Sequence, residues 1–204
     1  MKKTLTNLIL ASSLLVSTLT NFSCTIPSSF DLEKITRQSQ TKPNTALIII
    51  DSQYTFLHDI NRYELETESD NQVEVIKFAK KNNFPIYVFE IEGKGKTRKK
   101  LREELVNYKP ITKPHSSAFN KTNLDKLLKD QEIKNVILMG LNASICVLQS
   151  AQDANQKDYK VLISPDIIQD ATYLAGKNES LEEYKKVAKL FRTNDDLMEY
   201  LSNQ

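Results

Sequence analysis

Three side chains of the sequence have the types needed for covalent catalysis. Asp51 closes an apolar run, Lys113 lies in the segment ITKPHSSAF, and Cys146 stands where a segment with helical spacing begins. The N-terminus of a helix stabilises negative charge, so a cysteine there tends toward the nucleophilic thiolate. A nearby ammonium lowers the pKa of the thiol further, a carboxylate can carry protons, and turn amides can hold an oxyanion. The combination predicts a cysteine that attacks a carbonyl or amidine carbon.

Each of these residues also has an ordinary structural explanation. A single cysteine on a helix face is usually a small buried hydrophobic residue, and an aspartate at a strand end often caps the next turn. A single lysine is usually solvated. Cys24 and Cys146, the two cysteines of the chain, could also form a disulfide in an oxidising compartment. The catalytic interpretation therefore depends on whether the fold brings Asp51, Lys113 and Cys146 together.

The elements that must position these residues alternate between strands and helices. Short apolar, β-branched runs are typical of strands buried in a parallel sheet, and segments with apolar residues at helical spacing lie between them. This alternation predicts an α/β fold with three α-β-α layers and a mainly parallel sheet joined by right-handed crossovers. The expected strands are 45–51, 85–90, 135–139, 160–164 and an edge strand in AKLFRT, and the expected helices are 68–82, 97–106, 123–130, 145–156, 180–190 and 195–201.

The carboxyl ends of the expected strands form the edge where ligands bind in such sheets. Asp51, Glu90 and the turn before Cys146 all fall at this edge. Glu90 either faces a pocket or pairs with a lysine, and the sequence leaves both open. We expect the basic run 94–100 to be a solvated loop and helix start, with a contact to an anionic substrate or a membrane surface as the alternative. Asp153, Asp166 and His115 are expected to be structural or surface residues rather than catalysts.

The length, the net charge and the cysteine count of the chain exclude several classes of partner and of site. The 204 residues suit one compact domain, or one domain with a short appendage. The net charge of +2 comes without a concentrated basic stripe, so we do not expect nucleic acid as a partner. The cysteine count excludes both a C-x-x-C redox pair and a multi-cysteine zinc site. No glycine-rich dinucleotide or Walker loop is present.

The N-terminal segment is expected to lie outside the fold. Residues 1–23 combine a basic start with a short apolar run and predict a secretory signal, and residues 24–44 predict a polar tether before a domain at 45–204. Cys24 directly after the apolar segment indicates a bacterial lipoprotein signal with a lipidated cysteine, and an ordinary signal cut near 23–25 is the alternative. We therefore expect an exported protein of the periplasm or cell envelope, anchored to the membrane if Cys24 is lipidated.

Three motifs together resemble a known family. The segments DSQYTF, KPHSSAF and MGLNASICVLQSAQDA, in this order and spacing, are similar to the isochorismatase-like cysteine hydrolases, which include nicotinamidases, carbamoylsarcosine amidases and ureidoacrylate hydrolases. The resemblance covers about residues 45–170 and implies the family's Rossmann-like three-layer fold.

The resemblance also implies roles for individual residues. It implies a catalytic triad of Asp51, Lys113 and Cys146. A cis peptide between Leu141 and Asn142 would aim the backbone N–H of Asn142 at the oxyanion, beside the N–H of Cys146. The remaining matches, expected at the substrate pocket, are Gln53, Phe56 and Phe119.

The chain also departs from parts of the family. Nicotinamidases carry a metal site built from Asp-x-His and a further histidine, whereas Gln53 stands two residues after Asp51 and the histidines of the chain are His58 and His115. We therefore expect no metal and no other cofactor. Family members that cleave the vinyl ether of isochorismate typically lack the cysteine, so Cys146 favours cleavage of a C–N bond.

The expected function is that of a metal-independent cysteine hydrolase acting on a small amide or ureido compound through a thioester. The alternatives are a catalytically idle binding protein of the cell envelope on the same fold, and an ether-cleaving isochorismatase. Relatives commonly form dimers or tetramers, so a homo-oligomer is compatible with the sequence, although no motif specifies an interface.

Overall fold

The computed structural model describes residues 43–57, 60–171 and 177–204. The predicted signal segment 1–23, Cys24 with most of the predicted tether, and His58 lie outside these residues, and the expectations about them stay predictions. Within the described residues, no helix is both long and apolar enough to cross a membrane.

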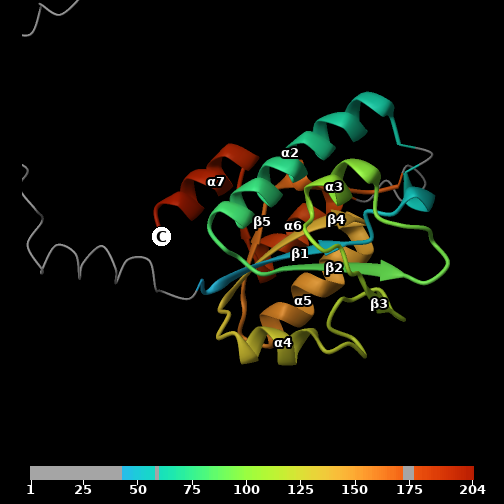
Figure 1. The fold of residues 1–204 in the computed structure, drawn as a ribbon. Coiled ribbons are helices and arrows are strands. Elements are labelled where there is room, and N and C mark those ends of the chain that lie inside the picture. The colour runs from blue at the N-terminus through green and yellow to red at the C-terminus, as the bar shows by residue number, and fades with distance from the viewer. Residues whose placement is uncertain (1–42, 58–59, 172–176) are drawn as a thin grey trace, which may run out of the picture. The chain divides into compact units, whose positions relative to one another are not determined.

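The centre of the domain is a parallel β-sheet with the strand order β3-β2-β1-β4-β5-β7, and β6 pairs with the end of β4 (Figure 1). Every residue of β1 and β4, the two central strands, is buried. Their continuous apolar runs therefore match a sheet covered on both faces. The strands are β1 Thr45–Ile50, β2 Ile86–Ile91, β3 Ile111–Lys113, β4 Asn135–Leu141, β5 Lys160–Ile163, β6 Ile168–Gln169 and β7 Lys189–Leu190.

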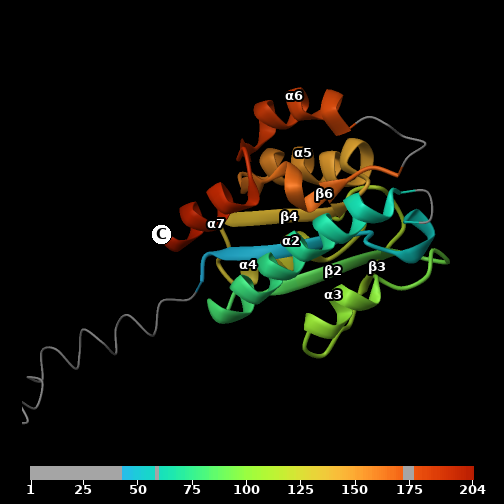
Figure 2. The same cartoon turned by 90° about the horizontal axis from the view of Figure 1, so that it is seen from above.

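Helices cover both faces of this sheet, which confirms the predicted three-layer α/β fold. Helices α2, α3 and α7 lie over one face, α4 and α5 lie over the other, and α6 packs against α5 (Figures 1 and 2). A π-helical turn, Ala143–Val147, directly precedes α5. The α-helices are α2 Arg62–Lys81, α3 Lys99–Glu104, α4 Leu124–Asp130, α5 Leu148–Gln156, α6 Lys177–Val187 and α7 Asn194–Ser202.

The expected elements differ from the observed ones mainly at their ends. Helix α2 begins at Arg62 rather than near residue 68, because the side chain of Asn61 accepts hydrogen bonds from the N–H groups of Tyr63 and Glu64 and caps an earlier turn. Strands β3 and β6 are absent from the prediction, since two or three residues are too few to show a period.

The two central strands approach each other closely at the edge that carries the candidate catalytic residues. Gly140 near the end of β4 pairs with Ile50 of β1, and it has a φ of +125°. A Cβ at this position would lie 1.9 Å from the carbonyl oxygen of Ile50. Glycine is therefore required where β4 turns toward Cys146, directly beside the strand that ends at Asp51.

Candidate active site

Asp51 and Lys113 form a completely buried ion pair at the carboxyl edge of the sheet. Asp51 follows β1 and Lys113 ends β3, and β2 lies between these two strands in the sheet. The Nζ atom of Lys113 lies 2.7 Å from Oδ2 of Asp51, and both side chains are 0% exposed. The same Nζ donates to the carbonyl oxygens of His115 and Ser116 at 2.9 and 2.8 Å. The ammonium is thus held in place by three oxygen atoms.

Cys146 joins this pair from the π-helical turn between β4 and α5. Its side chain is buried, with 4% exposed, and it interacts electrostatically with both Asp51 and Lys113. The backbone amide of Asn142 also hydrogen-bonds to the sulfur. The peptide bond between Leu141 and Asn142 is cis, as the resemblance implies. The fold therefore brings together the three side chains that lie far apart in the sequence.

The environment of Cys146 differs from the expected one. Burial, followed by the negative charge of Asp51, raises the pKa of the Cys146 thiol to about 11, and the charge of Lys113 only partly opposes this. The expectation of a low-pKa thiolate is wrong for the free protein, because desolvation outweighs the neighbouring ammonium. Cys146 also lies in the π-helical turn, ahead of the first residue of α5. At rest the cysteine is a neutral thiol.

The carboxylate beside the thiol is a stronger base than an exposed aspartate. Burial raises the pKa of Asp51 above its usual value, and the nearby charge of Lys113 opposes that shift. The charge of Glu90 raises the pKa of Asp51 further. The site thus pairs a neutral thiol with a carboxylate of increased basicity, an arrangement suited to proton transfer between them.

The turn that carries Cys146 is held by residues that the sequence analysis did not single out. The hydroxyl of Tyr184, a buried residue of α6, donates to the carbonyl of Ala143 at 2.5 Å. The N–H and the hydroxyl of Ser144 both donate to Oδ1 of Asp170 at 2.9 Å. The N–H of Ala171 donates to the side-chain oxygen of Asn142 at 3.2 Å. No local pattern in the sequence indicates these contacts, because each joins segments far apart in the chain.

Two of the three residues expected at the substrate pocket, Gln53 and Phe119, are buried within the fold. Gln53 is buried, and its amide donates to the carbonyl oxygens of Ile91 and Gly95 and accepts from the N–H of Ile91, so it ties the end of β1 to the segment after β2. Phe119 is buried in the main core, with its ring centroid 5.9 Å from that of Tyr159.

The third expected pocket residue belongs to a small separate cluster. Phe56 is half-buried and packs against the cluster of Leu57, Ile60 and Leu141, the last of which precedes the cis peptide bond. Contact of Gln53, Phe56 or Phe119 with a substrate stays a prediction.

Glu90 lies next to the ion pair but binds neutral groups. Its Oε1 atom accepts hydrogen bonds from the N–H and the hydroxyl of Thr97 and from the hydroxyl of Tyr108. Of the two alternatives left open by the sequence, pairing with a lysine is not observed among the described residues. Glu90 therefore acts on the site through its charge.

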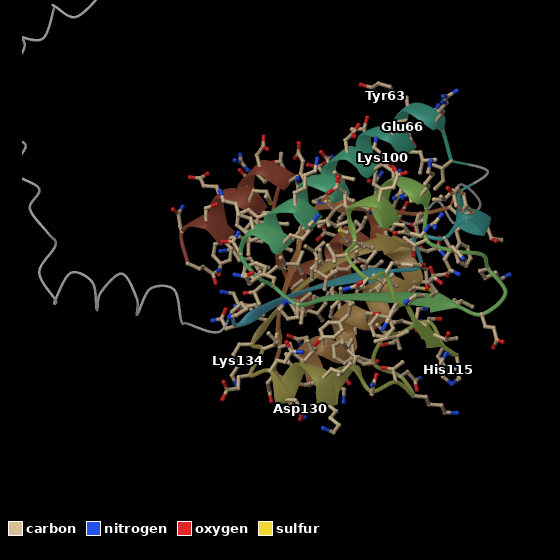
Figure 3. The ribbon with its side chains drawn as sticks, in the orientation of Figure 1. Tyr63, Glu66, Lys100, His115, Asp130 and Lys134 are labelled. Atoms are coloured by element: carbon tan, nitrogen blue, oxygen red, sulfur yellow. The ribbon has the colours of Figure 1, made fainter. Side chains whose placement is uncertain are left out.

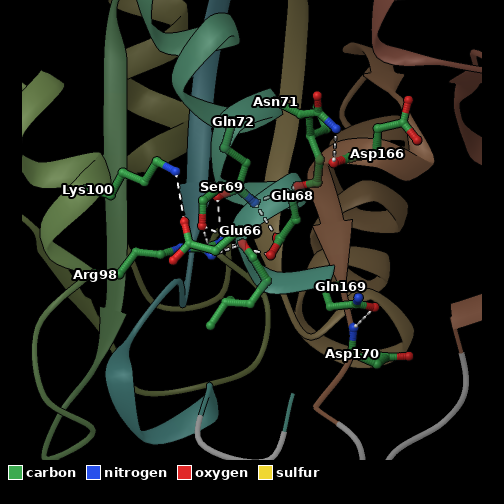
Figure 4. Close-up of polar contacts among 12 residues, drawn as sticks. Glu66, Glu68, Ser69, Asn71, Gln72, Arg98, Lys100, Asp166, Gln169 and Asp170 are labelled. Carbon is green, nitrogen blue, oxygen red and sulfur yellow. Dashed lines mark hydrogen bonds and ion pairs between the residues drawn. The ribbon is translucent and has the colours of Figure 1, made fainter. Parts of the chain in front are cut away.

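Arg98 corrects the expectation that the basic run 94–100 is solvated throughout. The Arg98 side chain is buried, with 4% exposed, and donates to Glu68, Ser69 and Gln72 of α2 at 2.9, 2.6 and 2.8 Å (Figure 4). The N–H of Arg98 also donates to the carbonyl of Ser52, which draws the loop over the residue that follows Asp51. Lys100, by contrast, pairs with Glu66 and Asp70 on the surface, as expected (Figures 3 and 4).

The expected structural residues have the places predicted for them. Asp153 accepts a hydrogen bond from Ser117, Asp166 accepts one from the N–H of Asn194, and His115 is exposed (Figure 3). Across the described ranges there is no group of three or more histidine, cysteine, aspartate or glutamate side chains able to hold a metal ion.

A cleft of about 570 Å³ lies next to the catalytic turn. It is formed by the N-terminal half of α2, by residues 166–171 and by the start of α6. Asp51, Lys113 and Cys146 do not line it, but Asp170, which holds Ser144 in the turn, does. Asp170 therefore links the cleft to the turn that carries Cys146.

The chain resembles known proteins in sequence and in fold. Residues 45–195 match the family model described as the isochorismatase domain. The uncharacterized isochorismatase family protein YaaI of Bacillus subtilis (strain 168) is 28% identical over 149 residues, which are 63% of this chain and 82% of that protein. Among solved structures, the MAR1 ribonuclease of Caenorhabditis elegans has a TM-score of 0.68 at 25% identity, over 80% of this chain and 84% of that one. The N-carbamoylsarcosine amidase of Thermoplasma acidophilum shares the fold, with a TM-score of 0.62 at 20% identity, over 74% of this chain and 96% of that one.

Proposed function

The chain belongs to the isochorismatase family, and on that premise we propose that it is a cysteine hydrolase that cleaves the C–N bond of a small amide or ureido compound through a thioester on Cys146. The observation that carries the proposal is the ion pair of 2.7 Å between Lys113 and Asp51, fully buried beside the thiol. A buried charge pair is costly to maintain, so its place next to a nucleophile supports a catalytic rather than a stabilising role.

In the first step, the sulfur of Cys146 attacks the carbonyl carbon while Asp51 takes the thiol proton. The thiol does not have to ionise beforehand, which matters because its pKa is raised to about 11. The carbonyl π electrons move onto oxygen, and the N–H groups of Asn142 and Cys146 are proposed to stabilise this oxyanion. Lys113 keeps the carboxylate in position through their ion pair.

In the following steps, the proton held by Asp51 passes to the nitrogen of the leaving group. The C–N bond breaks, ammonia or an amine departs, and a thioester with Cys146 remains. Asp51 then removes a proton from a water molecule as the water oxygen attacks the thioester carbon. The C–S bond breaks, the acid is released, and Asp51 returns its proton to the sulfur.

The direct test is to measure the release of ammonia from a panel of small primary amides and N-carbamoyl compounds. We expect turnover by the wild-type protein and loss of turnover in Cys146→Ala. Gln149→Ala, an exposed change on the same helical segment, is the matched control and should retain activity. Intact mass spectrometry of the quenched reaction should detect an acyl adduct on Cys146.

The two alternatives give different results in the same assays. Full turnover by Cys146→Ala, or an acyl adduct on another residue, would show that the thioester mechanism is wrong. Cleavage of the vinyl ether of isochorismate by both wild type and Cys146→Ala would favour the ether-cleaving function. Binding of amides without any turnover would favour the idle binding protein.

A further inference from the structure

The cleft beside the catalytic turn has an acidic lining. Its volume of about 570 Å³ is in the range of small-molecule sites. Its described lining contains four carboxylates and several neutral polar groups but no lysine, arginine or histidine. The residues that matter here are Glu64 and, as labelled in Figure 4, Glu68, Asn71, Asp166, Gln169 and Asp170.

Few basic side chains of the described residues are paired with this negative charge. Glu68 forms an ion pair with Arg98 at 2.9 Å. In contrast, no basic side chain among the described residues lies within ion-pair distance of Glu64, Asp166 or Asp170. Carboxylates that line a concave surface concentrate a negative potential there and attract cations.

Asp170 and Glu68 are the two buried carboxylates of the cleft, and Asp170 is the one next to the catalytic turn. Its side chain is only 6% exposed, and its Oδ1 atom accepts both hydrogen bonds from Ser144. Its Oδ2 atom is buried and has no hydrogen-bond partner. A buried acceptor without a donor destabilises a folded protein, so such an atom calls for an explanation. A positively charged ligand in the cleft would compensate the charge.

The position of Asp170 connects such a ligand to the nucleophile. Ser144, which Asp170 holds, belongs to the same π-helical turn as Cys146. Both Asp170 and Cys146 also contribute to raising the pKa of Tyr184, so both lie near the hydroxyl that binds this turn. A cationic group next to Asp170 would therefore lie a short distance from the reacting sulfur.

We propose that the acidic cleft binds a primary ammonium or guanidinium group of the substrate, and that the protein prefers amides that carry a positive charge. The part of the inference that concerns the reacting bond rests on the proposed function. The binding of a cationic amide in the cleft does not.

The test compares three amides of similar length that differ in their terminal charge. The probes are γ-aminobutyramide, which is cationic, butyramide, which is neutral, and succinamate, which is anionic. Binding is measured by calorimetry on the full chain carrying Cys146→Ala, so that no turnover interferes. We expect γ-aminobutyramide to bind at least roughly tenfold more tightly than the other two, the factor that corresponds to one charge-assisted contact.

Two changes in the cleft and one control make the result specific. Glu64→Gln, at an exposed position, and Asp170→Asn, which keeps a side-chain oxygen for Ser144, should each reduce the preference for the cationic amide. Glu66→Gln removes a carboxylate of the same helix that faces Lys100 instead of the cleft, and it should leave the preference unchanged.

Equal affinities, tighter binding of succinamate, absence of binding by all three amides, or a preference unaffected by both Glu64→Gln and Asp170→Asn would each overturn the inference. A cationic preference in binding together with no hydrolysis by the wild type would leave the inference intact and reject the proposed function. Hydrolysis by the wild type without tighter binding of the cationic amide would reject the inference and leave the proposed function intact.

Discussion

The hydroxyl of Tyr184 on α6 lies 2.5 Å from the carbonyl oxygen of Ala143 and donates a hydrogen bond to it. Tyr184 is fully buried, and Ala143 begins the π-helical turn that contains Cys146. Helix α6 therefore constrains the backbone next to the candidate nucleophile, although it contributes no side chain to the buried cluster of Asp51, Lys113 and Cys146.

Tyr184→Phe tests this constraint. The change removes the hydroxyl and leaves the ring, so the free energy of unfolding should fall by about 1–3 kcal/mol, the cost of an unpaired buried carbonyl. If the turn must be held in place for catalysis, kcat should fall while KM changes little. Urea unfolding and steady-state kinetics measure the two effects. Tyr87→Phe, which removes a hydroxyl bonded to Gln131 at the surface, is the control and should change neither quantity appreciably.

Asp51→Asn should separate the reactivity of the thiol from catalysis. The charge of Asp51 raises the pKa of Cys146, so removing it should lower that pKa from about 11. Alkylation of Cys146 by iodoacetamide at neutral pH should then become faster, while amide hydrolysis is lost because the base is absent. Peptide mapping measures the alkylation at Cys146 separately from Cys24. Slower alkylation in the variant would contradict the electrostatic account of the site.

Glu90→Gln should shift the acid limb of the pH–rate profile. Asp51 must be ionised to accept the thiol proton, so kcat/KM should fall as the pH decreases through the pKa of Asp51, which burial raises above 3.8. The charge of Glu90 contributes to that increase, so its removal should lower the pKa of Asp51 and move the limb to lower pH. The profile of kcat/KM against pH measures the shift, and a limb that moved to higher pH would contradict the prediction.

Arg98→Met should strongly destabilise the fold. The change removes the ion pair between Arg98 and Glu68, whose side chains are each only 5% exposed, and breaking a buried pair costs about 3–5 kcal/mol. Changing Glu68 to Gln in the same chain should recover part of this loss. Lys100→Met removes surface ion pairs with Glu66 and Asp70 and should cost less than about 1 kcal/mol. Urea unfolding of the four proteins decides whether the burial of Arg98 has the expected effect.

The main elements and the members of the buried cluster were predictable from the sequence. Strands β1 and β4 are covered on both faces, so nearly all of their positions need apolar side chains. This need produces a continuous apolar run that can be recognised in the sequence. Asp51, Lys113 and Cys146 could be singled out because together they have the types needed for covalent catalysis and because the surrounding motifs resemble one family. The cis peptide between Leu141 and Asn142 followed from the same resemblance.

The environment of these residues depends on contacts between distant segments and was not predictable. The direction of the pKa shift at Cys146 follows from burial and from the charge of Asp51, neither of which is encoded near residue 146. Tyr184 and Asp170 hold the turn from segments that follow β5 in the chain, and Arg98 is buried although Lys96 and Lys99 beside it are exposed. Local sequence patterns report which face of an element is apolar, whereas desolvation and hydrogen-bond partners arise only when the elements pack.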